Sequence, residues 1–239
     1  MALRAVTFDF WGTLYQNAYA HQERLELLGS VLERHKQVRE MDELEAAYSH
    51  ARSVWDRVWR DHQRSIPIER WLEELLGHLD VCLPEEAKRR LGETIESVYL
   101  RGDDPRPVLG VRDVLPSLSE RYRLGLISDT GLTPGRVLRE VMRRDGLLSY
   151  FDALTFSDEV GVAKPQPEPF LRTLDVLGVE AAGAAHIGDL PETDLRGARG
   201  VGMKAILFLG ISHREDGRKL ADAVFEDYGE LGALLERLE

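Results

Sequence analysis

Polar side chains that could do chemistry stand directly after three short apolar runs. The first run, residues 5–8, ends at Asp9; the second ends at Ser128 and the third at Asp189. Short apolar runs predict buried strands of a parallel sheet. In such sheets, ligands bind at the carboxyl ends of the strands. We therefore expect these three side chains to meet at one edge of a sheet.

Two further charged residues belong to the same edge in this interpretation. Asp194 follows Asp189 by five positions, and Lys164, one of five lysines against 26 arginines, precedes a proline that stiffens the segment before a helix. Converging carboxylates repel one another unless a cation neutralises them, and Mg²⁺ prefers oxygen ligands and leaves positions for phosphate oxygens. Lys164 and Ser128 would complete a site for a small tetrahedral anion. An aspartate beside a metal is a reasonable covalent nucleophile toward phosphorus, which makes Asp9 the candidate.

The elements that must position these residues alternate between strand and helix after residue 105. Predicted strands are residues 5–8, Arg123–Ile127, Ala153–Phe156, Ala184–Ile187, Ala205–Phe208 and Ala223–Phe225. Predicted helices are Arg112–Arg121, Pro134–Arg144, Glu168–Leu177, Thr193–Arg199 and Gly229–Leu238. This alternation is typical of βαβ units and predicts an α/β fold, a Rossmann-like parallel sheet with helices on both faces.

Residues 15–105 differ in character, because they are rich in Arg and Glu and follow a helical period. Breaks that predict four helices fall near Gln37–Asp42, Ser65–Pro67 and Gly77–Pro84. We therefore predict a discontinuous sheet domain, residues 1–14 and 106–239, with an α-helical insert at 15–105. Within the insert, Trp55, Trp59 and Trp71 are expected in its own core rather than against a substrate. One or two of its 11 arginines could reach the site.

The order and spacing of four segments resemble the sequence motifs of the haloacid dehalogenase (HAD) superfamily. These segments are Phe8–Leu14 (FDFWGTL), Ile127–Asp129, Lys164–Pro167 (KPQP), and Ile187–Asp189 with Asp194. Each motif alone is weak evidence, but four in register are strong. The helical insert resembles the first type of cap in that family (C1), since the gap from Ser128 to Lys164 is too short for the larger type.

The resemblance implies a role for each matching residue. Asp9 would be the nucleophile and a metal ligand, Ser128 would hydrogen-bond the transferring group, and Lys164 would balance charge. Asp189 would bind Mg²⁺ directly. Asp194 would bind the metal through water or hold Lys164 in position, and the Trp11 backbone carbonyl would bind the metal. The residues expected to contact the substrate are Trp11, Gly12, Ser128, Asp129 and Lys164. For Asp129, an ordinary turn at the strand end is the preferred interpretation, and His186 is expected to pack at a strand end.

Trp11 departs from the pattern of most phosphatases of the superfamily, which carry an acid–base aspartate at this position. An indole cannot give or take that proton, and losing a positioned acid–base group costs about 10²–10⁴-fold in rate. Three hypotheses follow. The first is a phosphatase-like hydrolase of small phosphorylated metabolites, slow or acting on acyl phosphates, phosphonates or aryl phosphates. The second is a 2-haloacid dehalogenase, and the third a HAD scaffold kept for binding. Dehalogenases of the family work without metal and lack the acid at Asp189, so the metal-dependent type is favoured.

Composition limits the remaining classes. The 239 residues carry a formal net charge of −11, which argues against nucleic-acid or anionic-membrane partners. The single cysteine, Cys82, excludes a disulfide framework and is expected to be a buried, inert thiol. No apolar run approaches 18 residues and the N-terminus lacks a signal peptide, so we expect a cytoplasmic protein with a small-molecule substrate. The sequence predicts no oligomeric state.

Overall fold

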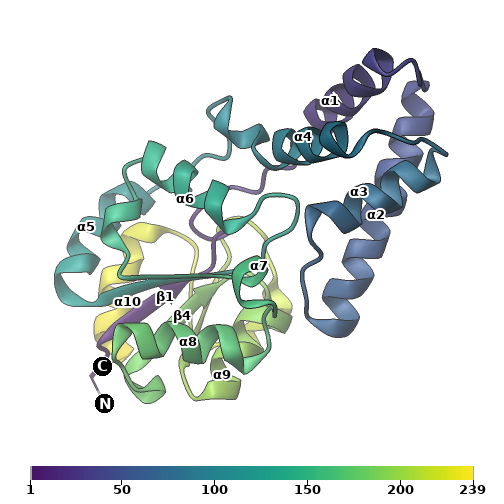
Figure 1. Cartoon of the computed structure of the whole chain (residues 1–239). Helices are drawn as coiled ribbons and strands as arrows, with labels where there is room; N and C mark the ends of the chain where they lie inside the picture. Colours follow the sequence, from purple (N-terminus) through teal and green to yellow (C-terminus); the bar gives the residue numbers. More distant parts are fainter. Residues whose placement is uncertain (1, 239) are drawn as a thin grey trace.

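The computed structural model describes residues 2–238 and contains one six-stranded parallel sheet (Figure 1). The strand order is β3-β2-β1-β4-β5-β6. The strands are β1 (Ala5–Phe8), β2 (Arg123–Ser128), β3 (Ala153–Phe156), β4 (Ala184–Gly188), β5 (Lys204–Phe208) and β6 (Ala223–Phe225). All residues of β1 and β4 are buried, which explains their apolar composition. The predicted Rossmann-like α/β fold is confirmed.

Helices cover both faces of the sheet, and each face has its own core. On one face α5 (Val111–Arg121), α6 (Gly135–Arg144) and α10 (Leu231–Leu238) pack over strand side chains such as Val6 and Phe8. On the other face α8 (Pro167–Leu177) and α9 (Arg196–Val201) pack over residues such as Ala5. Successive residues of β1 therefore enter opposite cores, as the two-residue period of a strand requires.

Local signals define α8, the helix that follows the Lys164 segment. Pro167 occupies its first turn, where a missing N–H costs nothing, and Gly178 ends it with a φ of 64°. Two elements differ from the prediction. The expected helix from Thr193 begins instead as a π-helical turn, Pro191–Leu195, which continues as α9. The short helix α7 (Ser157–Val160) was not predicted.

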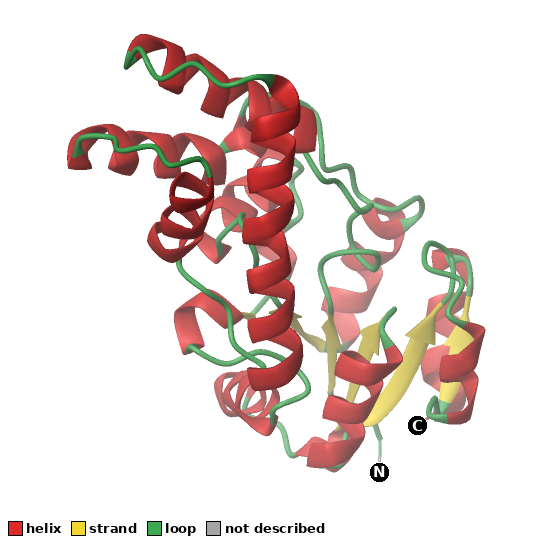
Figure 2. Ribbon diagram, turned by 90° about the vertical axis from the view of Figure 1, so that its right-hand side faces the viewer, coloured by secondary structure: helices red, strands yellow, loops and turns green. Residues whose placement is uncertain are grey.

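Four helices form the insert, in agreement with the predicted breaks: α1 (His21–Arg34), α2 (Met41–His62), α3 (Ile68–His78) and α4 (Glu85–Glu96). Their inward faces share a hydrophobic core that includes Leu25, Leu44, Leu75 and Ile95. The four helices gather to one side of the sheet (Figure 1), and α2 is the long helix that runs beside it (Figure 2). We refer to α1–α4 as the four-helix insert.

The chain leaves the sheet region and returns to it at one place. The amide of Gln16 donates to the carbonyl of Arg106 at 2.9 Å, and the amide of Val108 donates to the carbonyl of Leu14 at 2.9 Å. These two bonds flank an antiparallel bridge between Tyr15 and Pro107. The two connections to the insert are therefore joined at their base.

Two predictions about the insert are wrong. Cys82 is exposed, because it lies in an extended segment between α3 and α4 whose next residue, Leu83, takes the inward position. Trp55 and Trp59 are only partly buried and lie outside the insert's own core, whereas Trp71 is in that core as expected. Among residues 2–238, no helix is long and apolar enough to cross a membrane.

Candidate active site

The candidate site lies where the direction of strand order reverses. β1 is flanked by β2 on one side and β4 on the other, so the crevice at their carboxyl ends is the switch point at which such sheets bind ligands. Asp9 follows β1 and Asp189 follows β4. The amide of Asp9 donates to the carbonyl of Ile187 at 2.8 Å, which fixes the first residue of the loop after β1.

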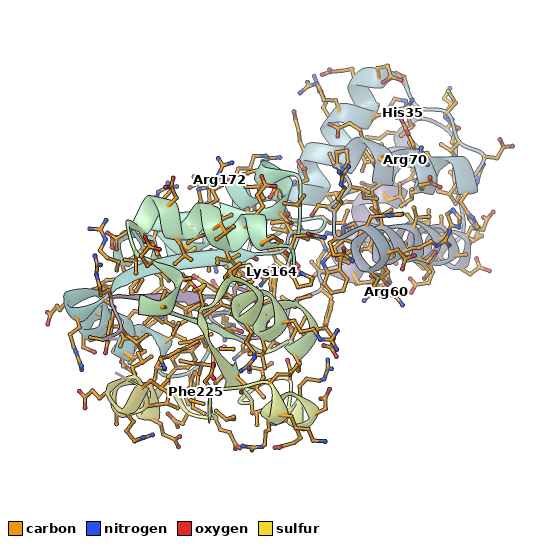
Figure 3. The ribbon with its side chains drawn as sticks, turned by 90° about the horizontal axis from the view of Figure 1, so that it is seen from below. His35, Arg60, Arg70, Lys164, Arg172 and Phe225 are labelled. Atoms are coloured by element: carbon orange, nitrogen blue, oxygen red, sulfur yellow. The ribbon has the colours of Figure 1, made fainter. Side chains whose placement is uncertain are left out.

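Lys164 is the cation of this crevice. Its ammonium group donates to Asp9 Oδ1 at 2.5 Å, to Asp194 Oδ1 at 2.6 Å and to the carbonyl of Ile127 at 3.0 Å. Only 2% of Lys164 is exposed. Figure 3 shows it on the side of the sheet that faces the helices carrying Arg60 and Arg70. All three donor positions of the ammonium are used, so Lys164 holds the two carboxylates in place.

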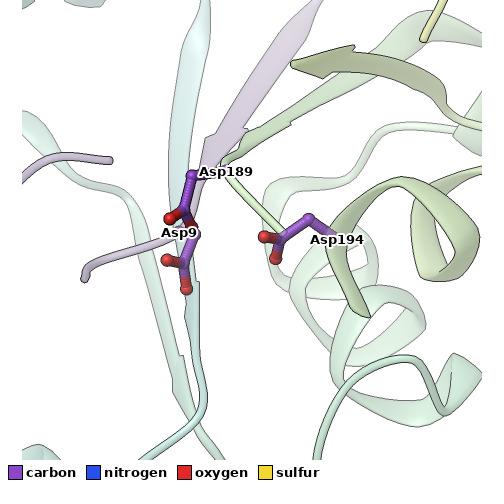
Figure 4. Close-up of side chains that lie close together, drawn as sticks. All are labelled: Asp9, Asp189 and Asp194. Atoms are coloured by element: carbon purple, nitrogen blue, oxygen red, sulfur yellow. The ribbon is translucent and has the colours of Figure 1, made fainter. Parts of the chain in front are cut away.

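Three carboxylates converge beside Lys164. Oxygens of Asp9, Asp189 and Asp194 lie within 4.8 Å of one another, and Figure 4 shows the Asp194 carboxylate directed toward those of Asp9 and Asp189. Asp189 Oδ2 accepts a hydrogen bond from Ser212, whereas Asp189 Oδ1 is buried and has no partner among residues 2–238. An unpartnered buried carboxylate oxygen is costly unless a cation meets it. The donor set therefore fits a hard divalent ion such as Mg²⁺.

Gly12 makes room for this cluster. It has a φ of 68°, and a β-carbon built there would stand 2.4 Å from Asp189 Oδ2. The position therefore excludes every side chain, because both the conformation and the close approach require glycine. Gly12 therefore lies directly against Asp189 of the candidate site.

Burial and like charge raise the pKa values of Asp9 and Asp189, whereas the neighbouring cation lowers that of Asp194. Burial raises the pKa of Asp9 well above its usual value; attraction to Lys164 opposes this shift, and repulsion from Asp194 adds to it. Burial also raises the pKa of Asp189 to about 6, with repulsion from Asp194 as the second cause. For Asp194 burial is outweighed by Lys164 and by the bond from His186, so its pKa is lowered.

Both carboxylate oxygens of Asp194 have hydrogen-bond partners. Besides Lys164, its Oδ1 lies 3.3 Å from His186 Nε2, and its Oδ2 accepts from the amide of Leu190 at 3.0 Å. His186 Nδ1 lies 2.8 Å from the hydroxyl of Thr7. His186 is fully buried, and burial lowers its pKa despite the neighbouring carboxylate. Both oxygens of Asp194 are occupied, which suits an indirect role better than direct coordination.

Ser128 and Asp129 follow β2, next to β1. Ser128 is buried, and its hydroxyl donates to the carbonyl of Asp129 at 3.3 Å. Asp129 Oδ1 accepts from the backbone amide of Lys164 at 2.9 Å, and Oδ2 accepts from the indole of Trp59 at 3.0 Å. Asp129 is therefore more than a turn residue, because it connects the lysine segment to α2 of the insert.

A cavity of about 230 Å³ opens between the insert and the loops after β1 and β2. Trp11 and Asp129 line it from the sheet side, and Trp55 and Trp71 line it from the insert. The Trp11 ring lies edge-on to Phe10, with centroids 4.8 Å apart, and tilted against Tyr99 at 5.8 Å. The residue two positions after Asp9 is thus part of an aromatic wall and supplies no acid or base.

Three contacts of the site were missed in the sequence. Ser212 reaches Asp189 from 23 residues away, and Trp59 reaches Asp129 from 70 residues away. His186 was seen as a packing residue, which it is against Phe170 at 5.1 Å between ring centroids, but it also contacts Asp194. Neither Ser212 nor Trp59 lies in a recognisable motif, so only the folded arrangement reveals them.

The fold and site together define an α/β sheet protein with a carboxylate site at the switch point. A family model described as haloacid dehalogenase-like hydrolase matches residues 3–202. The chain therefore belongs to the haloacid dehalogenase-like hydrolases, which agrees with the resemblance seen in its four motifs.

Individual relatives carry the names of two activities. A glyceraldehyde 3-phosphate phosphatase of Pyrococcus abyssi is 38% identical over 43% of this chain, and the chain spans only 42% of that relative's length. A structure described as a 2-haloacid dehalogenase from Pseudomonas syringae is 27% identical, with a TM-score of 0.74, over 99% of this chain and 100% of that one. A HAD phosphatase structure from Thermococcus onnurineus is 26% identical, with a TM-score of 0.65, over 98% of both chains.

Proposed function

We propose that this chain is a Mg²⁺-dependent hydrolase that takes a phosphoryl group onto Asp9 and releases it to water. The observation that carries the proposal is the unpartnered, buried Oδ1 of Asp189 in the cluster with Asp9 and Asp194. A site for a halide or a neutral group has no use for such an oxygen. Phosphatase names among the relatives support the choice of small phosphorylated compounds as substrates.

Asp9 is suited to attack because only one of its oxygens is engaged by Lys164. The ammonium binds Oδ1, which leaves Oδ2 for the phosphorus atom. Asp9 and Asp189, with the Trp11 carbonyl, would hold the Mg²⁺ ion. When bound, the ion would lower the raised pKa values of these carboxylates and offset negative charge on the phosphoryl oxygens.

The reaction has two steps, in which the chain's own residues have different roles. Asp9 Oδ2 forms a bond to phosphorus while the bond to the leaving oxygen breaks, giving an aspartyl phosphate and the free leaving group. Lys164 and Ser128 would stabilise the transferring group, and Asp194 would keep Lys164 charged and in position. Water then attacks phosphorus, which regenerates Asp9 and yields phosphate.

Trp11 restricts the first step to leaving groups that depart without a proton. The carboxylate that leaves an acyl phosphate and the phenolate that leaves an aryl phosphate meet this requirement, whereas the alkoxide that leaves an alkyl phosphate does not. For alkyl esters we expect a rate about 10²–10⁴-fold lower than a positioned acid would give.

The test compares acetyl phosphate, p-nitrophenyl phosphate and 2-chloropropionate, each with and without Mg²⁺. We expect phosphate release from the first two only with Mg²⁺, and none from the Asp9→Asn or Asp189→Asn variants. Trp11→Asp should raise activity toward alkyl phosphates. Phosphatase activity that survives in Asp9→Asn would exclude the covalent mechanism.

Carbon–halogen hydrolysis is the second candidate. Trp11 supports it, because a halide needs no proton, and so does the 27% identical structure described as a 2-haloacid dehalogenase. Chloride release from 2-chloropropionate without Mg²⁺, together with no phosphatase activity, would favour this candidate over the first.

A further inference from the structure

Aromatic side chains form much of the wall of the cavity beside Trp11, and polar and charged residues complete it. Six aromatic side chains line it: Trp11, Tyr19, Tyr48, Trp55, Trp71 and Tyr99. Two pairs of them are in ring contact: Tyr48 and Trp71 are edge-on at 5.1 Å between centroids, and Trp11 and Tyr99 are tilted at 5.8 Å. Aromatic pairs in such arrangements favour a further ring, either stacked or edge-on. The walls therefore suit a flat, unsaturated ligand.

Its volume matches the size of one ring. The cavity holds about 230 Å³. An apolar cavity of about 150 Å³ accepts benzene, and pockets for drug-sized ligands begin at about 300 Å³. A single substituted ring fits between these values.

The wall carries the Asp129 carboxylate on the sheet side and two arginines, Arg24 and Arg52, on the insert side. Arg24, which also lines the cavity, is committed to Thr133 and to backbone carbonyls. Arg52 lies at the exposed side, 5.9 Å above the Tyr19 ring, and makes no ion pair or hydrogen bond within the described part of the chain. A ring that carries an anionic substituent would give Arg52 a partner.

The chemistry at Trp11 points to the same ligand. A phenol has a pKa of about 10, whereas water, which resembles an alcohol, is near 15.7. A phenolate is therefore a leaving group that departs without the proton that Trp11 cannot give. The residue that removes the acid from the site is also a wall of the aromatic cavity.

We propose that this cavity holds the leaving group of the substrate, and that the substrate is a monocyclic aryl phosphate whose ring carries an anionic substituent such as a carboxylate. The inference rests on the proposed function, since it assigns to the cavity the part of the substrate that Asp9 displaces. The transfer itself is the step already described: the phosphorus–oxygen bond to the phenol breaks, and the phenolate leaves with the electron pair.

Non-hydrolysable phosphonates test the cavity separately from catalysis. Calorimetry in Mg²⁺ would compare methylphosphonate, phenylphosphonate and 4-phosphonobenzoate. Burial of the ring should make phenylphosphonate bind about tenfold or more tightly than methylphosphonate. The carboxylate should add about two- to fivefold at low salt, since Arg52 is exposed.

Three variants assign these effects to residues. Trp55→Leu should reduce the preference for phenylphosphonate, and Tyr19→Ala, at a residue 64% exposed, gives the same test if the first variant does not fold. Arg52→Gln should remove the benefit of the carboxylate alone. Arg57→Gln is the matched control, because Arg57 is an exposed residue of the same helix that does not line the cavity.

The outcomes separate this inference from the proposed function. Equal binding of methylphosphonate and phenylphosphonate, binding of neither, or a preference unchanged in both wall variants would overturn the aryl assignment. A carboxylate benefit that Arg52→Gln retains would overturn the anionic substituent. If the ring preference holds while acetyl phosphate and aryl phosphates are not hydrolysed, the cavity binds an aryl ligand, but the proposed function, and with it the role of that ligand as substrate, is wrong.

Discussion

Asp189 is a carboxylate whose two oxygens have different surroundings. One accepts from Ser212, and the other is buried without a partner among residues 2–238. Its charge is therefore a cost to the folded chain until a cation binds. This gives a substitution at Asp189 two effects of opposite sign, one on stability and one on metal binding.

We predict that Asp189→Asn stabilises the metal-free protein at pH 7.5. The ordinary pKa of 3.8 rises to about 6 in the folded chain, and each unit corresponds to 1.36 kcal/mol, so the gain is on the order of 1–3 kcal/mol. Thermal unfolding with EDTA measures it. The same variant should lose the rise in Tm that Mg²⁺ gives the wild type. A variant that keeps this rise would show that the ion binds elsewhere.

The raised pKa of Asp189 also predicts how metal affinity depends on pH. The folded state holds a proton that the unfolded state releases above pH 4, so the contribution of this group to stability is lost as pH rises through about 6. Asp9 shifts in the same direction. Because Mg²⁺ competes with the proton on Asp189, its affinity should rise as the pH increases through about 6. Titration calorimetry at three pH values checks this; a constant affinity contradicts it.

At the scale of single elements, α2 connects the insert to the loop after β2. Trp55 and Trp59 stack on this helix, with ring centroids 5.8 Å apart and planes inclined by 6°. Their indole N–H groups differ: that of Trp59 donates to Asp129, and that of Trp55 is buried with no acceptor in residues 2–238. The same substitution at Trp55 and at Trp59 therefore separates the contribution of the hydrogen bond to stability from that of ring packing.

We predict that Trp59→Phe destabilises the protein by about 1–3 kcal/mol, because it leaves a buried carboxylate short of a donor. Trp55→Phe is the matched control and should cost less, since the lost N–H has no partner to abandon. Denaturant unfolding of both variants measures the difference. Equal losses would mean that ring volume, rather than the bond to Asp129, determines the effect.

At the scale of the whole molecule, we propose that residues 15–105 act as a lid over residues 1–14 and 106–239. The contacts across this boundary include hydrogen bonds as well as aromatic packing, such as that of Trp11 on Tyr99. The amide of Ala163 donates to the carbonyl of Gln63 at 2.7 Å, and the hydroxyl of Ser65 donates to the carbonyl of Thr130 at 2.8 Å. Hydrogen bonds of this kind can break and re-form when a lid moves.

Hydrogen exchange tests the lid through the amide of Ala163, whose acceptor is on the other side of the boundary. We expect its exchange to slow when Mg²⁺ and phenylphosphonate bind, because the ligand favours the closed arrangement. The amide of Leu126, inside β2, serves as the reference and should not change. Binding that leaves Ala163 unaffected would argue for a fixed insert.

The sequence predicted the structure correctly where a residue type is typical of one local conformation, such as apolar residues in a buried parallel strand or glycine in a tight turn. Buried parallel strands are apolar throughout, so β1 and β4 could be predicted within one residue, and the residues that follow them could be placed at one edge. The turn at Gly12 was visible for the same reason. Cys82 was misjudged because side-chain direction in a loop depends on which neighbour, here Leu83, takes the inward position.

Contacts between the insert and the rest of the chain could not be predicted from local sequence patterns. The helical period places Trp55 and Trp59 on one face of α2, but it does not say what that face meets. Their proximity to Asp129 and Gly131 depends on how two separately packed units are set against each other. The aromatic cavity arises from the same placement, so no single segment of the sequence contains it.

The joined base at Leu14 and Val108 has a consequence for how this protein can diversify. The two chain connections are hydrogen-bonded side by side. The sheet domain therefore keeps the same structure at this place whether the segment between the connections is long or short. Doubling the length of such a segment adds only about 0.6 kcal/mol of closure entropy. A different helical segment with matching ends could be grafted there, and ligand choice would change while the carboxylates and Lys164 keep their places.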